Sequence, residues 1–307
     1  MTQDTPEYNK YLVCIAGPTG VGKSELALRL ASHFDSEIIS CDSRQLYAEM
    51  KIGTARPTAD QMDTITHHMV GSISIHDSFS TGDYERMVLP IISRLFEIHD
   101  IVLLVGGTGL YFKAITEGLD QFPDVPAAIT EDLNQLLQER GIEILQDQLK
   151  EKDPEYFKTV DIHNPHRLIR ALGVIQQSGQ PYSSFLQKEV LERPFKVIPI
   201  FVNMDREILY DRINRRVRKM MEIGQIEEAK ELYPFKNIQA LHTVGYKELM
   251  DYFDGLHSLE EAIQLIQRNS RRYAKRQITW YRNQGQWIEM DINDFESIVD
   301  LVQSYIK

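Results

Sequence analysis

The sequence has only two cysteines in 307 residues, and both Cys14 and Cys41 fall in apolar runs typical of core strands. This scarcity argues against a disulfide-stabilised fold or a cysteine metal site and predicts small buried thiols instead. No apolar stretch approaches the about 18 residues that a membrane-spanning helix needs, and the polar N-terminal segment lacks the pattern of a signal peptide. We therefore expect a cytoplasmic protein that does not associate with membranes.

Positive charge is also scarce. The chain has 34 lysines and arginines against 45 aspartates and glutamates, a formal net charge of -11, which disfavours a general nucleic-acid binder because basic residues must neutralise phosphates. The charges are segregated, however: acidic residues concentrate between 120 and 161, whereas residues 268–282 contain none. Such a segment indicates a local anionic partner, with a solvated helix face as the alternative. Its basic residues are Arg268, Arg271, Arg272, Lys275, Arg276 and Arg282.

Short apolar runs alternate with helical patterns along most of the chain. With 42% hydrophobic residues, the chain can form one large domain or two unequal ones. The alternation predicts an α/β fold, a doubly wound parallel sheet flanked by helices, with its ligand site at the carboxyl ends of the strands. Asp42 and Thr108 fall at that edge. The predicted strands are 11–16, 38–41, 101–105, 197–202 and 287–290.

Residues 122–193 contain no convincing strand. Helical patterns and charged turns dominate there, with Asn164 and Pro165 placed as N-cap and first helical residue. We predict a smaller all-helical insertion domain over 122–193, carried by a core domain formed by 1–121 and 194–307. In the core domain, Ser258 and Glu261 have the spacing of a capping box, which predicts the start of a long helix through the basic segment.

The segment GPTGVGKS at residues 17–24 matches the pattern G-x-x-x-x-G-K-[ST] between a predicted strand and a predicted helix. Its glycines let backbone N–H groups surround phosphate oxygens, while the helix N-terminus and the lysine add positive charge. We expect the whole loop to bind phosphate groups, with the Ser24 hydroxyl as a ligand of Mg²⁺; an ordinary glycine turn is the alternative. The residues are Gly17, Pro18, Thr19, Gly20, Val21, Gly22, Lys23 and Ser24.

A phosphate loop predicts that the protein binds phosphate groups, but it does not determine which reaction the protein catalyses. Nucleoside triphosphatases usually hold Mg²⁺ through an aspartate at the end of a buried strand, whereas the run at 101–105 ends in glycines. Asp42 at the end of the neighbouring predicted strand is the well-placed carboxylate. Three roles are open to it: a carboxylate linked to the metal, a base, or a helix cap.

Further segments with distinctive residues follow the loop. They are DSRQLY at 42–47, IGTARP at 52–57, GGTGLYFKA at 106–114, HNPHRLIRAL at 163–172, RINRRVRKMMEIG at 212–224, TVGYKEL at 243–249 and AKRQITWYRN at 274–283. Together with the loop, they resemble the tRNA dimethylallyltransferase family, the IPP transferases. The segments occur in the family's order and cover nearly the whole chain, which makes them far more specific than the loop alone.

The resemblance implies an enzyme that transfers the dimethylallyl group of dimethylallyl diphosphate to N6 of the adenosine immediately 3′ of the anticodon in tRNA, with Mg²⁺ as cofactor. The phosphate loop would hold the leaving diphosphate, and Lys23 and Arg216 would stabilise its charge. Asp42 would orient the attacking amine and accept its proton, with the Thr19 hydroxyl close to the reacting groups.

The resemblance also implies contacts with the anticodon stem-loop. A base inside a folded loop cannot reach a buried carbon, so we expect it to be extruded into a channel, with the diphosphate entering from the other side. The basic segment, and a second stripe of Arg212, Arg215, Arg216 and Lys219, could grip RNA phosphates. The residues expected to bind tRNA are Asp42, Ser43, Arg44, Gln45, Thr108, His166, Arg167, Leu168, Ile169, Arg170, Lys275 and Arg276.

Two residues of these segments, and a histidine pair outside them, invite a functional interpretation that we do not adopt. Trp280 and Tyr281 could stack on a base, but core packing is the preferred prediction. His67 and His68 resemble a pair in the family; polar packing and catalysis both remain open to them, and we leave them out of the expected catalytic residues.

Three alternatives remain. A P-loop kinase or ATPase would bind ATP in the same loop and use Asp42 as the base for a small hydroxyl, which leaves the basic helices unexplained. A prenyltransferase acting on free adenine nucleotides would have little need of the helical insertion. An RNA-binding module without catalysis would not need Lys23, Ser24 and Asp42 together. A monomer is our default expectation.

Overall fold

The computed structural model describes residues 9–186 and 191–306, so the polar start of the chain, 1–8, lies outside the described residues. Backbone contacts divide the chain into two compact units. The first comprises the residues up to Thr116 and from Glu192 onward, and the second is Glu117–Leu191. The second unit begins and ends slightly earlier than the insertion expected at 122–193.

Arg193 shows why the boundary falls where it does. Its guanidinium pairs with Glu85 at 2.5 Å and donates to the carbonyl oxygens of Ala114 and Ile115 at 2.8 and 2.9 Å. These contacts fix the returning chain to the first unit, where it leads directly into the next strand.

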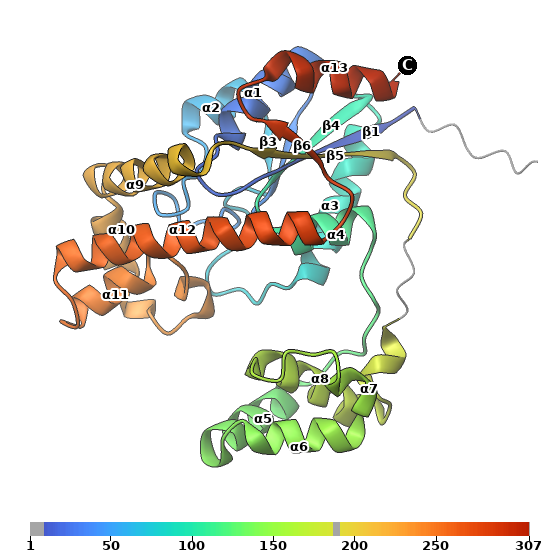
Figure 1. The fold of residues 1–307 in the computed structure, drawn as a ribbon, viewed down its shortest axis with the longest axis vertical. Helices are drawn as coiled ribbons and strands as arrows, with labels where there is room; N and C mark the ends of the chain where they lie inside the picture. The colour runs from blue at the N-terminus through green and yellow to red at the C-terminus, as the bar shows by residue number, and fades with distance from the viewer. Residues whose placement is uncertain (1–8, 187–190, 307) are drawn as a thin grey trace, which may run out of the picture. The chain divides into compact units, whose positions relative to one another are not determined.

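A parallel sheet forms the centre of the first unit. Over the described residues it has six strands in the order β3-β2-β4-β1-β5-β6, and every neighbouring pair is parallel (Figure 1). The five predicted strands are confirmed, and the two-residue edge strand β3 is additional. The strands are β1 Tyr11–Ala16, β2 Ile38–Cys41, β3 His67–His68, β4 Ile101–Gly106, β5 Lys196–Asn203 and β6 Ile288–Asp291.

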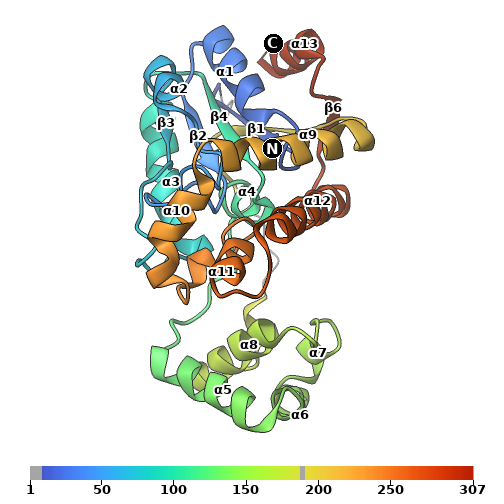
Figure 2. The ribbon, with the colours of Figure 1, turned by 90° about the vertical axis from the view of Figure 1, so that its left-hand side faces the viewer.

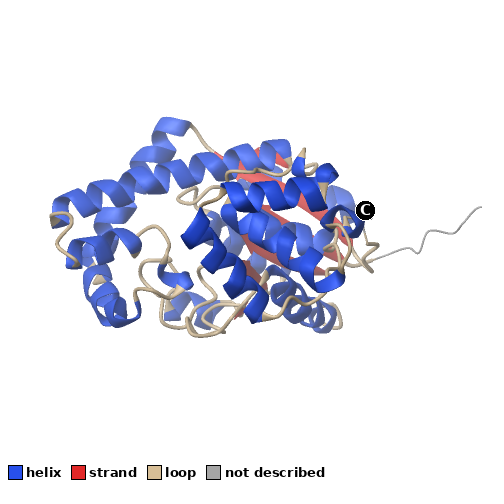
Figure 3. Cartoon of the chain, turned by 90° about the horizontal axis from the view of Figure 1, so that it is seen from below, coloured by secondary structure: helices blue, strands red, loops and turns tan. Residues whose placement is uncertain are grey.

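Helices cover both faces of this sheet (Figure 3). The helices of the first unit are α1 Lys23–Phe34, α2 Ala59–Thr64, α3 Thr81–Leu95, α4 Gly109–Thr116, α9 Arg206–Glu222, α10 Gln225–Leu232, α11 Lys247–Phe253, α12 Leu259–Asn283 and α13 Phe295–Ile306, with the short turns η2 Tyr233–Phe235 and η3 Gln239–Leu241. Alternate residues of β1 point to opposite faces. Val13 and Ile15 pack with α1, α9 and α13, whereas Leu12 and Cys14 pack with α3 and α4.

A third apolar cluster joins α9 to α12 and the loop after β2. It includes Met50, Val217, Tyr246 and Ile266, all buried. Both views show α12 running beside α9 (Figures 1 and 2). Ser258 accepts a hydrogen bond from the Glu261 N–H and the Glu261 carboxylate accepts one from the Ser258 N–H, which confirms the predicted capping box at the start of α12.

The second unit is a small helical bundle within its described residues. Its core contains Leu133, Leu145, Leu149 and Leu172. The predicted helix start is confirmed, because the Asn164 side chain accepts hydrogen bonds from the first backbone N–H groups of α8. The helices are α5 Ala127–Arg140, α6 Glu143–Lys152, α7 Pro154–Phe157 and α8 Pro165–Ser178, followed by η1 Tyr182–Phe185.

Two expectations from composition can be compared with this fold. Cys14 and Cys41 are both buried and free, which confirms the prediction of core thiols. Across residues 9–186 and 191–306, no helix combines the length and the apolar character that crossing a membrane requires.

Candidate active site

The phosphate loop connects β1 to α1. Gly20 and Gly22 have φ angles of +87° and +112°, in the left-handed region that favours glycine. Space is also short, since a Cβ on Gly20 would lie 2.7 Å from Cγ1 of Ile213 on α9. Gly22 is the N-cap of α1 and makes no side-chain cap, so the N–H groups of the first helical turn remain available to an anion.

Lys23 reaches back across this loop. Its Nζ donates to the carbonyl oxygens of Gly17 and Pro18 at 2.9 and 3.0 Å. Burial lowers the pKa of Lys23 to about 8, an effect that the Asp42 carboxylate opposes and the Arg216 guanidinium reinforces. Lys23 is therefore mostly protonated at neutral pH and places a positive charge at the loop.

Arg216 on α9 holds the loop from the other side. Its Nη2 donates to the Thr19 hydroxyl at 2.5 Å, and its buried Nε has no hydrogen-bond partner among the residues that the structure describes. Burial lowers the pKa of Arg216, while the Asp42 carboxylate raises it. A cation with a buried, unused donor is typical of a site built for an anionic ligand.

The other predicted loop residues have different surroundings. Gly20, Gly22, Lys23 and Ser24 line one cavity of about 320 Å³. Val21 is fully buried in the core, so its side chain serves packing, and the carbonyl groups of Gly17 and Pro18 bind Lys23.

A second cavity, of about 260 Å³, lies directly beside the first. It is lined by Ser43, Arg44, His242, Tyr273 and Arg276, among others. The two cavities share four lining residues, which form the wall where they meet: Thr19, Asp42, Thr54 and Arg216. Two ligands, one in each cavity, would therefore come into contact at this wall.

Asp42 follows β2 and begins a tight turn. Its Oδ1 accepts the backbone N–H of Arg44 at 2.9 Å. Ser43 is fixed next to it, because its N–H donates to the Thr108 hydroxyl at 3.0 Å. The Gln45 side chain donates to the carbonyl groups of the following loop at 3.2 and 3.4 Å. The expected tRNA-binding segment is thus held by one internal hydrogen bond and by others to neighbouring loops, with the Asp42 carboxylate at the shared wall.

The segment expected to bind tRNA on α8 does not present all its side chains to solvent. His166, Arg167 and Arg170 are exposed. Leu168 and Ile169 are 0% and 7% exposed in the core of the second unit, so their side chains are not available at its surface. On a helix, a run of five consecutive residues necessarily turns part of itself inward.

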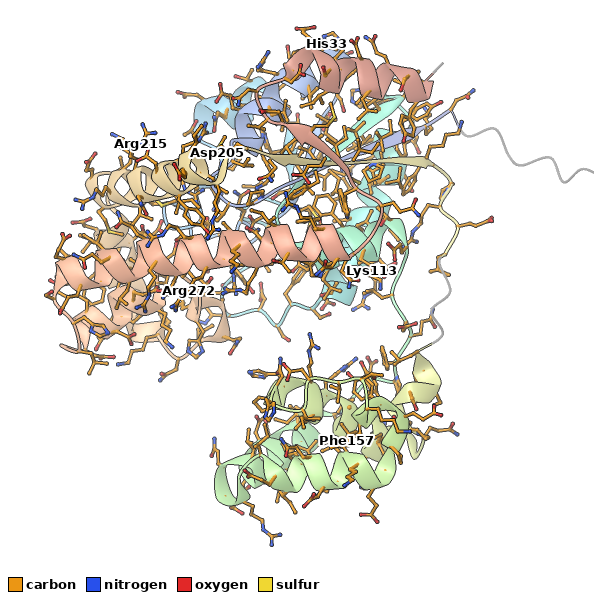
Figure 4. All side chains as sticks on the ribbon, in the orientation of Figure 1. His33, Lys113, Phe157, Asp205, Arg215 and Arg272 are labelled. Carbon is orange, nitrogen blue, oxygen red and sulfur yellow. The ribbon has the colours of Figure 1, made fainter. Side chains whose placement is uncertain are left out.

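The two basic stripes are also divided. On α12, Lys275 and Arg276 are exposed, as is Arg272, labelled in Figure 4. Arg271 instead donates to Asn214 at 2.5 Å, and Arg282 pairs with Glu289 on β6 at 2.9 Å. Arg268 and Arg282 at the two ends of the segment are exposed as well, whereas Arg271 is half-buried, so the basic face keeps its length but loses Arg271 to a contact with α9.

The stripe on α9 is split between two faces. Arg212 and Arg216 lie at the phosphate loop, where the Arg212 Nε donates to the Gly20 carbonyl at 3.2 Å. Arg215, labelled in Figure 4, is exposed and pairs with Asp211 at 2.6 Å. Half of the stripe therefore belongs to the phosphate site and half to the solvated surface.

The members of the Trp280–Tyr281 and His67–His68 pairs have different surroundings. Tyr281 is 2% exposed, which confirms core packing, and Trp280 packs so closely on Gly109 that a Cβ there would be 2.3 Å from the ring. His68 pairs with Glu37 at 2.6 Å. His67 lines the first cavity, and burial lowers its pKa.

Gln277 and Thr54 lie in motifs that the sequence analysis quoted, but neither was assigned a role at the site. Gln277 on α12 is buried, lines the first cavity and bonds the Thr19 N–H. The sequence feature that could have revealed Gln277 is a polar residue on the apolar side of a helix, between Ala274 and Tyr281.

The oxygen donors of the first cavity suit Mg²⁺ better than a transition metal. The Ser24 hydroxyl and the carboxylates of Glu25 and Asp42 line it, and the described chain holds no cluster of three or more His, Cys, Asp or Glu residues that could bind a metal. Mg²⁺ commonly takes few protein ligands, keeps several waters and binds substrate phosphates. The residues present therefore fit the ion.

A parallel sheet with a glycine-rich loop between its central strand and the next helix defines the P-loop NTPase-like class, and the predicted fold class is confirmed. The family model described as IPP transferase matches residues 45–284. The tRNA dimethylallyltransferase of Christiangramia forsetii is 52% identical over 301 residues, which cover 97% of this chain and 99% of that protein. The chain therefore belongs to the IPP transferase family, as the sequence motifs predicted.

Solved structures of related proteins are also similar to this chain. The tRNA isopentenylpyrophosphate transferase of Bacillus halodurans matches with a TM-score of 0.69 and 38% identity, covering 97% of this chain and 95% of that one. A eukaryotic dimethylallyltransferase matches with a TM-score of 0.78, covering 96% of this chain and 77% of that one. At 23% identity, this second match shows a shared fold.

Proposed function

We propose that this protein transfers a dimethylallyl group from dimethylallyl diphosphate to N6 of the adenosine immediately 3′ of the anticodon in tRNA. The bond between the allylic carbon and the diphosphate oxygen breaks, and its electron pair leaves with the diphosphate. A bond forms between that carbon and N6, and the proton lost from N6 passes to a carboxylate. The relatives' names and the family match support this reaction class.

The observation that carries the proposal is the pair of adjoining cavities. One contains the phosphate loop, and the other is lined by residues that include Arg44 and Arg276. Both are walled by Thr19, Asp42 and Arg216. A diphosphate in the first cavity and an extruded base in the second would bring the allylic carbon and N6 together at this wall.

Charge in the first cavity favours departure of the diphosphate. The allylic carbon becomes positive and the leaving oxygen negative as their bond breaks, so fixed positive groups stabilise the transition state. Lys23, Arg216 and the first-turn N–H groups of α1 supply them. Mg²⁺ held by Ser24 and the diphosphate oxygens would add neutralisation when bound.

Asp42 is the proposed base. Its Oδ1 is occupied by the Arg44 N–H, so the turn orients the carboxylate at the wall of the second cavity. An exocyclic amine is a weak nucleophile, and a carboxylate that accepts one of its hydrogen bonds both orients it and takes its proton. Of the three roles open to Asp42, base catalysis fits the two-cavity geometry best. On the RNA side, the exposed Lys275 and Arg276 of α12 and the exposed His166, Arg167 and Arg170 of α8 are the proposed phosphate contacts.

A labelling experiment separates this function from its alternatives. The protein is incubated with dimethylallyl diphosphate labelled in its isoprenoid group and with unmodified tRNA, free AMP, or ATP and small hydroxyl acceptors. We expect label in tRNA alone. Label in AMP would favour an enzyme acting on free nucleotides, and phosphate release from ATP without prenylated RNA would favour a kinase.

A further inference from the structure

Gln277 is a buried polar side chain on the inner side of α12. It is 7% exposed and stands between Ala274 and Tyr281, about one turn away on either side. Burying a side-chain amide costs free energy unless its polar atoms are hydrogen-bonded. An apolar residue would be sufficient for packing alone. The hydrogen bonds of the Gln277 amide are therefore the feature that needs an explanation.

The amide of Gln277 joins two loops that belong to different strands. Its Oε1 accepts the backbone N–H of Thr19 in the phosphate loop at 2.8 Å. Its Nε2 donates to the carbonyl oxygen of Gly107, directly after β4, at 2.9 Å. The approach is so close that a Cβ on Gly107 would lie 2.3 Å from Nε2. Glycine at this position is therefore part of the same arrangement.

Thr19 is consequently fixed at both its polar groups. Gln277 holds its backbone N–H, and Arg216 donates to its hydroxyl at 2.5 Å. The bond to Gly107 also steadies its neighbour Thr108, whose hydroxyl accepts the Ser43 N–H at 3.0 Å. One side chain thus connects the phosphate loop to the turn that begins at Asp42.

We propose that Gln277 is a positioning residue for prenyl transfer. By holding the Thr19 N–H, it sets the orientation of the Thr19 hydroxyl and of Arg216 at the wall between the cavities. The inference rests on the proposed function, because it assigns Gln277 a part in that reaction. It acts through Thr19, and its loss should lower turnover without weakening the capture of RNA.

The first test compares two glutamines on one helix. Gln277→Met removes both hydrogen bonds at nearly constant side-chain length. Gln267→Met is the matched control, since Gln267 is also partly buried on α12 and donates to the Asn214 carbonyl at 3.1 Å. We expect Gln277→Met to lower kcat by about 10- to 100-fold, the cost of a small misplacement at a reacting centre, with KM for tRNA unchanged. Equal kcat values in the two variants, or a raised KM with unchanged kcat, would overturn the proposal.

A double-mutant cycle then asks whether Gln277 acts through Thr19. Thr19→Ala keeps the backbone N–H but removes the hydroxyl. In the Thr19→Ala protein, Gln277→Met should lower kcat by less than about threefold, because the group that Gln277 positions is already absent. If the loss of kcat in the double variant equals the product of the losses in the two single variants, Gln277 does not act through Thr19.

Gln277→Glu supplies a second readout that does not depend on how well the methionine variant folds. A glutamate can still accept the Thr19 N–H, but it can donate to Gly107 only when protonated, and burial raises the pKa of a carboxyl group. Turnover of Gln277→Glu relative to wild type should therefore rise as pH falls. A ratio that does not change with pH would contradict the donor role.

Wild-type protein assayed alongside separates the two claims. Prenylation by wild type together with undiminished prenylation by Gln277→Met contradicts the positioning role and leaves the proposed function intact. Absence of prenylation by wild type contradicts the proposed function, and the inference fails with it.

Discussion

Replacing Arg216 with methionine would test how charge is used at the phosphate loop. Arg216 is half-buried, donates to the Thr19 hydroxyl at 2.5 Å, and has one buried donor, Nε, with no partner in the described chain. Burial lowers its pKa, so the folded protein holds this charge against a desolvation cost. An anionic ligand that binds this charge would offset the desolvation cost.

The size of the effect follows from that geometry. Removing one preorganised donor from developing negative charge in a water-poor site typically lowers kcat by about 10²–10³-fold, or about 2.7–4 kcal/mol. Replacing a buried charge by an apolar side chain is often neutral or stabilising. We therefore expect Arg216→Met to lose about 10²–10³ in kcat while its Tm in the absence of ligands does not fall below that of wild type.

The assay measures steady-state prenylation of tRNA together with thermal unfolding. Arg215→Met is the matched control, because Arg215 is the adjacent residue on α9, is exposed and pairs with Asp211 at the surface; its kcat should stay within about twofold of wild type, since exposed ion pairs contribute little. The reasoning is refuted if Arg216→Met keeps kcat within about threefold of wild type, or if the two variants lose activity equally.

Three further predictions concern ionisation, base catalysis and the loop after β2. Because burial lowers the pKa of Lys23 to about 8, kcat/KM for dimethylallyl diphosphate should fall as pH rises through about 8, and Lys23→Arg should remove that decline; an unchanged profile would contradict the assignment. Asp42→Ala should retain diphosphate binding by calorimetry but lose most turnover, and full turnover would remove Asp42 from the role of base. Glu228→Gln should lower the free energy of unfolding in urea by about 1–3 kcal/mol, whereas unchanged stability would show that the carboxylate does not anchor the loop. The backbone N–H groups that it accepts are those of Lys51, Ile52 and Gly53.

Much of the sheet could be predicted because its signals are local. Short apolar runs located β1, β2, β4 and β5, the first three of them followed by glycine or aspartate, and the loop pattern between β1 and α1 placed the phosphate site. β3 could not be predicted, since it has two residues, both histidines, and no periodicity can be read from so short a strand.

The wall between the cavities could be predicted only in part. Asp42 was located by its place after a predicted strand, and Arg216 came from the family motifs. Gln277, however, contacts Thr19 across 258 positions of sequence, and no local pattern encodes that contact. Similarly, Leu168 and Ile169 belong to a motif whose inward side is set by α5 and α6 packing on α8. Motifs locate a segment, whereas tertiary packing decides which of its side chains face the ligand.

One measurement tests the central claim most directly: the fate of two labels in dimethylallyl diphosphate, one on the isoprenoid carbon and one on the phosphorus next to it. If the diphosphate, held by the loop, leaves the isoprenoid carbon as N6 of the adenosine attacks it, the carbon label should appear in tRNA at the adenosine 3′ of the anticodon. The phosphorus label should then appear only in free diphosphate. Phosphorus label in the RNA or in a small acceptor, or carbon label that never reaches tRNA, would contradict the account.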